Sequence, residues 1–239
     1  MITFVKTGQK YDLLVSLPED YASSTRRYPV LYVLDGWHFP LMAFLQNNIP
    51  YSKKMPAVIM VNISHGAVNT MALRARDFTP TTLKTESGSG GAPAFLDFLA
   101  NDVIPFVDRT YRTLPGDRGL LGHSYGGLFA LFVLEQRPEL FQRIVAASPI
   151  VGWDHRLLFK GSDRLKRLTA PVRLDLSVGS EEKPDWVRDN VAFAKLLRMR
   201  KPRLLDYRFS LYPAENHDSV RLESFPRGLY WVYRSAEKK

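Results

Sequence analysis

The 239-residue chain contains no cysteine. This absence excludes disulfide bonds, thiolate zinc sites, iron–sulfur clusters and a cysteine nucleophile, and it leaves the redox compartment open. Long apolar runs are also missing. No stretch approaches the ~18–20 apolar residues of a transmembrane helix, and runs such as 128–134 are short. The sequence has no P-loop and no G-x-G-x-x-G dinucleotide motif, so we expect no cofactor.

Acidic residues are fewer than basic ones. Asp and Glu number 24 and Lys and Arg number 33, which gives a net charge of +9. Such an excess attracts nucleic acid, anionic membranes or anionic substrates. Here the basic residues are scattered, with short clusters only at 53–54 and 198–203. We interpret the charge as a solvated surface with a bias towards anionic ligands, and we expect neither nucleic acid nor a membrane as a partner.

The composition is that of a globular protein, with 45% apolar and 24% charged residues. It excludes intrinsic disorder, collagen and coiled coil, and a chain of this length buries a sizeable core unaided. We predict one domain over residues 1–239. The first residues, MITFVKTGQKYDLL, lack the features of a signal peptide. We therefore expect a cytoplasmic protein, or a periplasmic one if a signal peptide has been removed.

Strand-like and helix-like segments alternate along the chain. Period-two or continuous apolar patterns predict strands, and apolar residues at helical spacing predict helices. The expected strands are 2–5, 9–17, 30–34, 58–63, 118–121, 143–147, 172–178 and 205–212, and the expected helices are around 95–104, 126–136, 184–199 and 219–234. This alternation predicts an α/β fold with a mostly parallel central sheet and helices on both faces.

Two segments depart from this pattern. Pro105 is expected to bend or end the helix that begins near Phe95. The segment 64–91 is polar and contains the low-complexity stretch 87–91. Loops of this length are often functional or mobile, so we interpret the segment either as a disordered surface loop or as a lid.

Residues 122–126, Gly-His-Ser-Tyr-Gly, match the G-x-S-x-G nucleophile elbow. A predicted strand precedes the motif and a predicted helix follows it, which is the context that the motif requires. The tight turn exposes Ser124 Oγ at a helix N-terminus, where the helix dipole and free N–H groups favour negative charge. We expect the turn to require glycine at both Gly122 and Gly126. Ser124 is the candidate nucleophile.

A serine nucleophile needs a base, and the chain contains five histidines. They are His38, His65, His123, His155 and His217. In α/β-hydrolases the order along the chain is Ser, acid, His. His155 precedes the last two predicted strands, which leaves no strand for an acid, whereas His217 follows the last strand at the carboxyl edge of the sheet. His217 is therefore the candidate base, and His123 is expected to be structural.

Three carboxylates, Glu181, Glu182 and Asp185, follow the penultimate predicted strand. Each could accept a hydrogen bond from Nδ1 of His217, fix its tautomer and stabilise the imidazolium. The oxyanion hole needs two backbone N–H groups. One is expected from Tyr125, and the other from Gly36 or Trp37, which follow the strand 30–34.

Several segments extend a resemblance over nearly the whole chain. They are YDLLVSLPEDY, YPVLYVLDG, RARDFTPT, FLDFLANDVIPFVDRTYRT, LLGHSYGGLFALF, AASPIVGW, VGSEE and PAENHDSV. As a set they resemble the Putative esterase family of α/β-hydrolases, which includes the enterochelin (catecholate siderophore) esterases. The resemblance implies Ser124 as nucleophile and His217 as base. It also implies an acid three residues after the strand-ending glycine, which is Glu182 here.

These residues predict a serine carboxylic-ester hydrolase that forms an acyl-enzyme intermediate and takes a small-molecule ester as its partner. Possible substrates are siderophore-like, aryl or short-acyl esters. Trp153 is expected to line the pocket, and Arg74 and Arg76 to form a basic rim that favours anionic or aromatic acyl groups. In the alternative, both arginines bind carboxylates of the loop and the pocket takes short acyl chains. The alternatives are an acyltransferase or thioesterase with the same triad, and an inactive hydrolase-fold binding protein. The sequence does not predict the oligomeric state.

A metal site is not expected. The candidate metal ligands show no ligand spacing such as H-E-x-x-H. They are Asp35, His38, His65 and Asp77. Asp77 is instead interpreted as a structural anchor for the segment 64–91.

Overall fold

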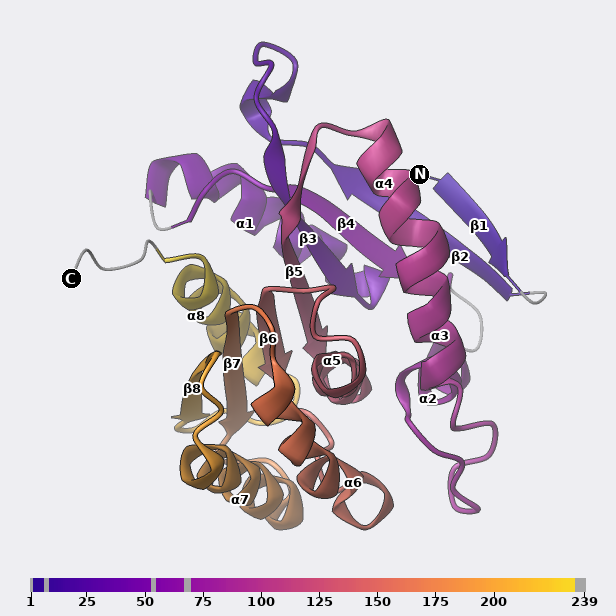
Figure 1. Cartoon of the computed structure of the whole chain (residues 1–239), viewed down its shortest axis with the longest axis vertical. Helices are drawn as coiled ribbons and strands as arrows, with labels where there is room; N and C mark the ends of the chain where they lie inside the picture. Colours follow the sequence, from indigo (N-terminus) through magenta and orange to yellow (C-terminus); the bar gives the residue numbers. More distant parts are fainter. Residues whose placement is uncertain (1, 7–8, 53–54, 67–69, 235–239) are drawn as a thin grey trace.

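The structure is a computed structural model that describes residues 2–6, 9–52, 55–66 and 70–234 (Figure 1). Its strands form one sheet in the order β1-β2-β4-β3-β5-β6-β7-β8. Strands β1 and β2 pair antiparallel, as do β2 and β4, and the other neighbours pair in parallel. The strands are β1 (Ile2–Lys6), β2 (Gln9–Ser16), β3 (Tyr28–Leu34), β4 (Ile59–Ser64), β5 (Thr113–His123), β6 (Arg143–Ala147), β7 (Val172–Gly179) and β8 (Leu205–Tyr212). The predicted mostly parallel α/β sheet is confirmed.

The two strands expected at 2–5 and 9–17 pair as an antiparallel hairpin, with Ile2 opposite Leu13 and Lys6 opposite Gln9. Residues 7–8, between them, lie outside the described residues. Along β2, Tyr11 and Leu13 are buried, because successive side chains of a strand point to opposite faces.

Helices cover both faces of this sheet (Figure 1). They are α1 (Phe39–Ser52), α2 (Thr70–Phe78), α3 (Ala92–Phe98), α4 (Ile104–Thr110), α5 (Tyr125–Gln136), α6 (Trp153–Gly161), α7 (Pro184–Arg200) and α8 (Val220–Tyr233). Side chains of α1 and α8 pack in one core, and side chains of α3, α5, α6 and α7 pack in another.

Strand β3 shows why the central strands carry continuous apolar runs. All of its residues are buried. Val30, Tyr32 and Leu34 belong to one core, and Leu31 and Val33 belong to the core on the opposite face. A strand with both faces covered has no exposed side, so period-two alternation disappears from its sequence.

Two sequence-based expectations about helices are wrong. The segment 64–91 was expected to be a loop, but it contains α2 over Thr70–Phe78. Of the two outcomes expected at Pro105, an end of the helix is wrong, because the helical chain continues from α3 through a π turn, η3 (Leu99–Val103), into α4. Pro105 is the second residue of α4, directly after the π turn. A π turn changes the hydrogen-bond pattern there, so the missing proline N–H does not stop the helix.

The carboxyl ends of β3, β5, β6, β7 and β8 lie at one edge of the sheet, because these strands run in parallel. The segments that follow these ends carry the candidate catalytic residues and oxyanion donors named from the sequence. No helix within the described ranges is long and apolar enough to cross a membrane.

Candidate active site

Ser124 lies in the turn between β5 and α5. Its backbone has φ 60° and ψ −119°, a conformation that a residue with a side chain adopts only under strain. A Cβ on Gly122 would overlap the carbonyl oxygen of Gly126, so the turn requires glycine at 122. A Cβ on Gly126 would meet Asp35 at 3.4 Å, an ordinary contact. Crowding therefore does not require glycine at 126, contrary to the expectation.

The backbone on either side holds Ser124 at the start of α5. Its N–H donates to the carbonyl of Ala147 at 3.0 Å, and its own carbonyl accepts from Leu128 N–H at 2.9 Å. The N–H groups of the first helical turn have no intrahelical partners. Negative charge that develops beside Ser124 is therefore favoured by free donors and by the helix dipole.

Glu182 and His217 meet across two neighbouring loops. His217 Nδ1 donates to Glu182 Oε2 at 2.7 Å. Oε1 of the same carboxylate accepts from Ser148 Oγ at 2.5 Å and from the backbone N–H of Gly179 at 2.8 Å. Burial alone would raise the pKa of Glu182, but these three hydrogen bonds outweigh burial and hold the pKa below its ordinary value. The carboxylate is ready to support a charged imidazole.

The two other candidate acids lie elsewhere. Glu181 and Asp185 are exposed, and Asp185 pairs with Arg188 at 2.7 Å. Of the three carboxylates that the sequence leaves open, the structure places Glu182 against the imidazole.

A second histidine holds His217 beside the elbow. His123 Nε2 donates to the carbonyl oxygen of His217 at 2.8 Å, and the two ring centroids are 4.5 Å apart. Burial lowers the pKa of His123 well below its ordinary value, so this ring stays neutral. Because His123 directly precedes Ser124, the contact connects His217 to the turn that carries Ser124. Among the described residues no hydrogen bond joins Ser124 Oγ to His217.

Sequence reasoning missed two neighbours of this pair. Ser148, at the end of β6, has φ 45° and is buried against Glu182. Trp186, in the first turn of α7, has its ring 4.7 Å from the His217 ring. The available signals were weak: a serine before a proline at a strand end, and an aromatic residue near a helix start.

The candidate oxyanion donors lie at two helix starts. Gly36 and Trp37 begin η2 (Gly36–His38) directly after β3, and Tyr125 begins α5. A Cβ on Gly36 would overlap the side chain of Ser64, so the chain passes β4 too closely for any other residue. Trp37 is 43% exposed, which leaves its ring available to a ligand.

Arg74 and Arg76 do not form the expected basic rim. Arg74 is only 3% exposed, and its guanidinium bonds both oxygens of Asp35 at 2.6 and 2.9 Å. Arg76 bonds both oxygens of Asp77 at 2.6 and 2.8 Å. The expectation is wrong because a carboxylate within reach binds each guanidinium, and because helix α2 turns Arg74 inwards.

Trp153 is also more enclosed than a pocket-lining residue needs to be, with 7% of its surface exposed. Its ring packs edge-on against the Tyr125 ring at 5.8 Å, and its Nε1 donates to Thr81 Oγ1 at 3.0 Å. The hydroxyl of Thr81 in turn donates to Asp154 at 2.7 Å. Thr81, in the segment after α2, is thereby bonded to Trp153 and Asp154, next to the Tyr125 ring.

Asp77 anchors the chain where β4 and α2 approach β2. It accepts from Tyr11 OH at 2.8 Å and lies 2.9 Å from His65 Nε2, so its contacts are those of a structural anchor. His38 stands apart from them, and burial lowers its pKa to about 3. No group of three or more His, Asp and Glu side chains in the described part of the chain is placed to hold a metal ion.

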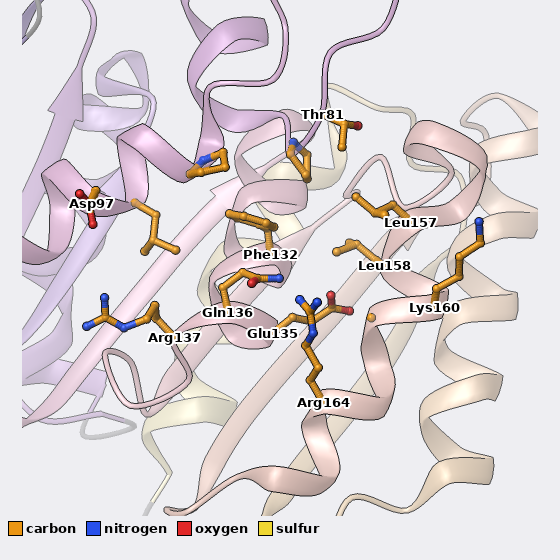
Figure 2. A pocket seen from close by; sticks show the side chains of 14 residues that line it. Thr81, Asp97, Phe132, Glu135, Gln136, Arg137, Leu157, Leu158, Lys160 and Arg164 are labelled. Atoms are coloured by element: carbon orange, nitrogen blue, oxygen red, sulfur yellow. The ribbon is translucent and has the colours of Figure 1, made fainter.

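A cavity of about 620 Å³ lies between α3, α5 and α6, and Thr81 is among its lining residues (Figure 2). Apolar side chains such as Leu96, Phe132 and Leu158 line it, together with the charged Glu135 and Arg164. None of the candidate catalytic residues lines this cavity.

The fold and the site together define an α/β-hydrolase. A serine on a strained turn after a central strand, an acid after β7 and a histidine after β8 follow the order of that fold. The family model described as Putative esterase matches residues 5–206. The chain belongs to this family and is an esterase, as the resemblance of its segments predicts.

Two curated relatives illustrate the match. Ferri-bacillibactin esterase BesA of Bacillus subtilis (strain 168) is 27% identical over 242 residues, which cover 92% of this chain and 83% of the relative. The siderophore triacetylfusarinine C esterase of Aspergillus fumigatus is 35% identical over 156 residues, which cover 62% of this chain and 53% of the relative. The match to the fungal enzyme thus spans about half of its length.

Solved structures agree with the fold. The BES protein from Bacillus cereus aligns with a TM-score of 0.88 and 25% identity, covering 98% of this chain and 94% of its own. An IroE-like serine hydrolase from Shewanella oneidensis aligns with a TM-score of 0.86 and 28% identity, covering 97% of this chain and 79% of its own.

Proposed function

We propose that this esterase forms a single catalytic domain that hydrolyses carboxylic esters of siderophores through an acyl-enzyme on Ser124. The observation that carries the mechanism is the 2.7 Å hydrogen bond from His217 Nδ1 to Glu182 on loops beside the Ser124 turn. This bond fixes the tautomer that leaves Nε2 of His217 free to accept a proton.

In the first half-reaction, His217 Nε2 takes the proton of Ser124 while Oγ attacks the ester carbonyl carbon. The carbonyl oxygen becomes an oxyanion, which the backbone N–H groups of Tyr125 and of Gly36 or Trp37 stabilise. When the intermediate collapses, the ester C–O bond breaks. The leaving alcohol takes the proton from His217, and the acyl group stays on Ser124.

In the second half-reaction, a water molecule gives a proton to His217 and its oxygen attacks the acyl carbon. The same N–H groups stabilise the second oxyanion. Collapse releases the carboxylic acid and returns the proton to Ser124 Oγ. Glu182 keeps its negative charge throughout and stabilises the imidazolium in both steps, which agrees with the lowered pKa of this carboxyl.

The substrate class comes from the relatives. The two curated relatives above are named as esterases of ferri-bacillibactin and of triacetylfusarinine C. The net charge of +9 favours an anionic ligand. The rings of Trp37, Tyr125 and Trp186 offer aromatic surface close to the candidate triad.

Labelling and turnover test the two parts of the proposal. A fluorophosphonate is expected to modify Ser124, located by peptide mass spectrometry, and to leave Ser124→Ala unmodified. A siderophore trilactone, iron-loaded and iron-free, is then compared with p-nitrophenyl esters of increasing acyl length. We expect at least ~10-fold higher kcat/KM for the siderophore, about 1.4 kcal/mol of extra transition-state binding.

Three results would change the proposal. Labelling at another serine would overturn the mechanism. Labelling at Ser124 without a preference for the siderophore would overturn the substrate class and leave the mechanism standing. A new ester, formed when a competing alcohol is added, would identify an acyltransferase instead of a hydrolase.

A further inference from the structure

A buried arginine joins the two loops that supply the proposed oxyanion donors. Arg74 Nε and Nη2 bond the two oxygens of Asp35 at 2.6 and 2.9 Å. Arg74 Nη2 also donates to the carbonyl oxygen of His123 at 3.2 Å. Asp35 directly precedes Gly36, and His123 directly precedes Ser124. A single guanidinium therefore bonds the chain just before both parts of the site.

This guanidinium is enclosed. The side chains of Arg74 and Asp35 are 4% and 0% exposed. The guanidinium carbon lies 4.8 Å from the centre of the Trp37 ring and 5.8 Å from that of Tyr125. A planar guanidinium that makes two parallel bonds to a carboxylate has one preferred geometry. Arg74 is thus fixed by its bonds and by the rings of Trp37 and Tyr125, two residues to which the proposed function assigns oxyanion donors.

The backbone conformation of Asp35 explains what the bonds from Arg74 can stabilise. Asp35 has φ 66° and ψ 90°, a conformation that is strained for any residue with a side chain. The surrounding structure must hold it there. The bonds from Arg74 hold the Asp35 side chain, and the next peptide group carries the N–H of Gly36. Without them, this peptide group is free to relax away from its present direction.

We propose that Arg74 is a positioning residue that sets the separation and direction of the backbone N–H groups of the oxyanion hole. This inference rests on the proposed function, which assigns these donors to Tyr125 and to Gly36 or Trp37. Arg74 is buried and its guanidinium is bonded to Asp35 and His123, so we expect it to act without touching the substrate. Its effect falls on the transition state, because the donors bind most strongly to the oxygen that carries the developing charge.

The test uses two substitutions and a matched control. Arg74→Lys keeps the charge but cannot form two parallel bonds, and Asp35→Asn keeps the shape but removes the charge. The control is Arg143→Lys. Arg143 also bonds both oxygens of a carboxylate, that of Asp117, at 2.5 and 2.9 Å, and a backbone carbonyl, that of Val232, at 2.7 Å. It lies at the start of β6, at the opposite end of the parallel strands from Ser124.

With an aryl ester as substrate, we expect Arg74→Lys and Asp35→Asn to lower kcat by about 10²–10³-fold while KM changes by less than about threefold. For Arg143→Lys we expect kcat within about twofold of the parent. Thermal unfolding is measured for every variant, and rates are compared at a temperature at which each variant is folded.

Two further measurements separate positioning from a purely structural role. A trifluoromethyl ketone forms a tetrahedral adduct with the serine and places its oxygen in the hole, whereas an unreactive amide of the same shape does not. We expect Arg74→Lys to weaken binding of the ketone in parallel with kcat/KM and to leave amide binding unchanged. We also expect added guanidinium, below unfolding concentrations, to raise kcat of Arg74→Ala and not of Arg143→Ala.

The contrary results are distinct. Any one of three results would overturn the inference. The first is that Arg74→Lys weakens binding of the ketone and of the amide equally. The others are an unchanged kcat in the folded Arg74 variants and failure of all the Arg74 and Asp35 variants to fold. If Ser124→Ala is inactive and Arg74→Lys has a normal kcat, the positioning role of Arg74 is refuted and the proposed role of Ser124 as nucleophile still stands. Full activity in Ser124→Ala would instead remove the proposed function.

Discussion

Ser148 Oγ donates a 2.5 Å hydrogen bond to Glu182 Oε1, the oxygen that His217 does not use. The serine at the end of β6 therefore orients the carboxylate that follows β7. A lost hydrogen bond to a charged group costs about 1.5–3 kcal/mol, of which we expect part to reach the transition state. Ser148→Ala should lower kcat/KM by about threefold to thirtyfold.

The control for this variant is Ser162→Ala. Ser162 is equally buried and donates to the carbonyl of Phe159, away from Glu182. Steady-state kinetics with an aryl ester measure both variants. An unchanged kcat/KM in Ser148→Ala would show that Gly179 and His217 orient the carboxylate without Ser148.

The choice of acid is tested by three parallel substitutions. Glu182→Gln removes the negative partner of His217, and we expect kcat to fall by about 10²–10⁴-fold, within the range for a triad acid. Glu181→Gln and Asp185→Asn change exposed groups, and we expect kcat within about twofold of the parent. Equal small losses in all three would mean a Ser–His dyad without a dedicated acid.

Glu182 also makes stability depend on pH. Its folded-state pKa lies below the ordinary value, so the folded state binds fewer protons than the unfolded state in acid. The stability from this group is present above about pH 4.5 and is lost as pH falls through the folded pKa. Urea unfolding should show the parent more stable than Glu182→Gln at pH 7, by a margin that narrows at pH 3.5. A margin independent of pH would contradict this ionisation.

The strained turn predicts a difference between two inactive variants. Ser124→Ala and Ser124→Gly both remove the nucleophile, and both should lose about 10⁴–10⁶ in kcat. Alanine keeps the Cβ and therefore the strain at φ 60°, whereas glycine relieves it. Glycine also increases the entropy of the unfolded chain, which offsets part of the relief of strain. The net expectation is that Ser124→Gly is about 1 kcal/mol more stable than Ser124→Ala, or about 2–4 °C higher in Tm. Equal Tm values would show that the turn stores no strain.

Glu135, which lines the cavity of Figure 2, should make stability depend on pH in the opposite direction. Burial raises its pKa to about 8, although Arg164 and Arg200 oppose the shift. Between about pH 4.5 and 8 the folded state then binds more protons than the unfolded state, so stability falls as pH rises through this window.

Glu135→Gln removes that titration. We expect the variant to match the parent near pH 5 and to exceed it by on the order of 1–3 kcal/mol at pH 8.5. The measurement is urea unfolding at both pH values, with the exposed Glu139→Gln as the control. A difference that is the same at both pH values would mean that Glu135 does not ionise on unfolding.

The sequence predicts best where apolar patterns are strong. Strands β6 and β8 begin and end at the predicted residues. Strand order alone predicts Ser124 first, then an acid among Glu181, Glu182 and Asp185, and then His217. Helix α2 was missed because it is short and polar, with two arginines and an aspartate. Helix α1 was missed as well. Its second residue is Pro40, and proline usually argues against a helix, but at this position the missing N–H is tolerated.

Contacts between distant residues were out of reach. Arg74 is buried because it meets Asp35, 39 positions earlier in the chain, and no local pattern announces such a partner. The acid was ambiguous for the same reason. Three carboxylates follow β7 within a few residues, and the sequence favours Glu182 only through the family resemblance. The physical distinction is the approach of Ser148 and His217 from other strands.

The proposed reacting groups lie on connecting segments at one edge of a sheet whose two faces are covered by helices. Side chains that border the site without filling the core, such as Trp37 and Trp186, are not fully buried. A mutant library confined to these two positions would change few of the contacts that keep the chain folded. Laboratory evolution can therefore select a new substrate first and restore lost thermal tolerance afterwards, in separate rounds and in separate parts of the gene.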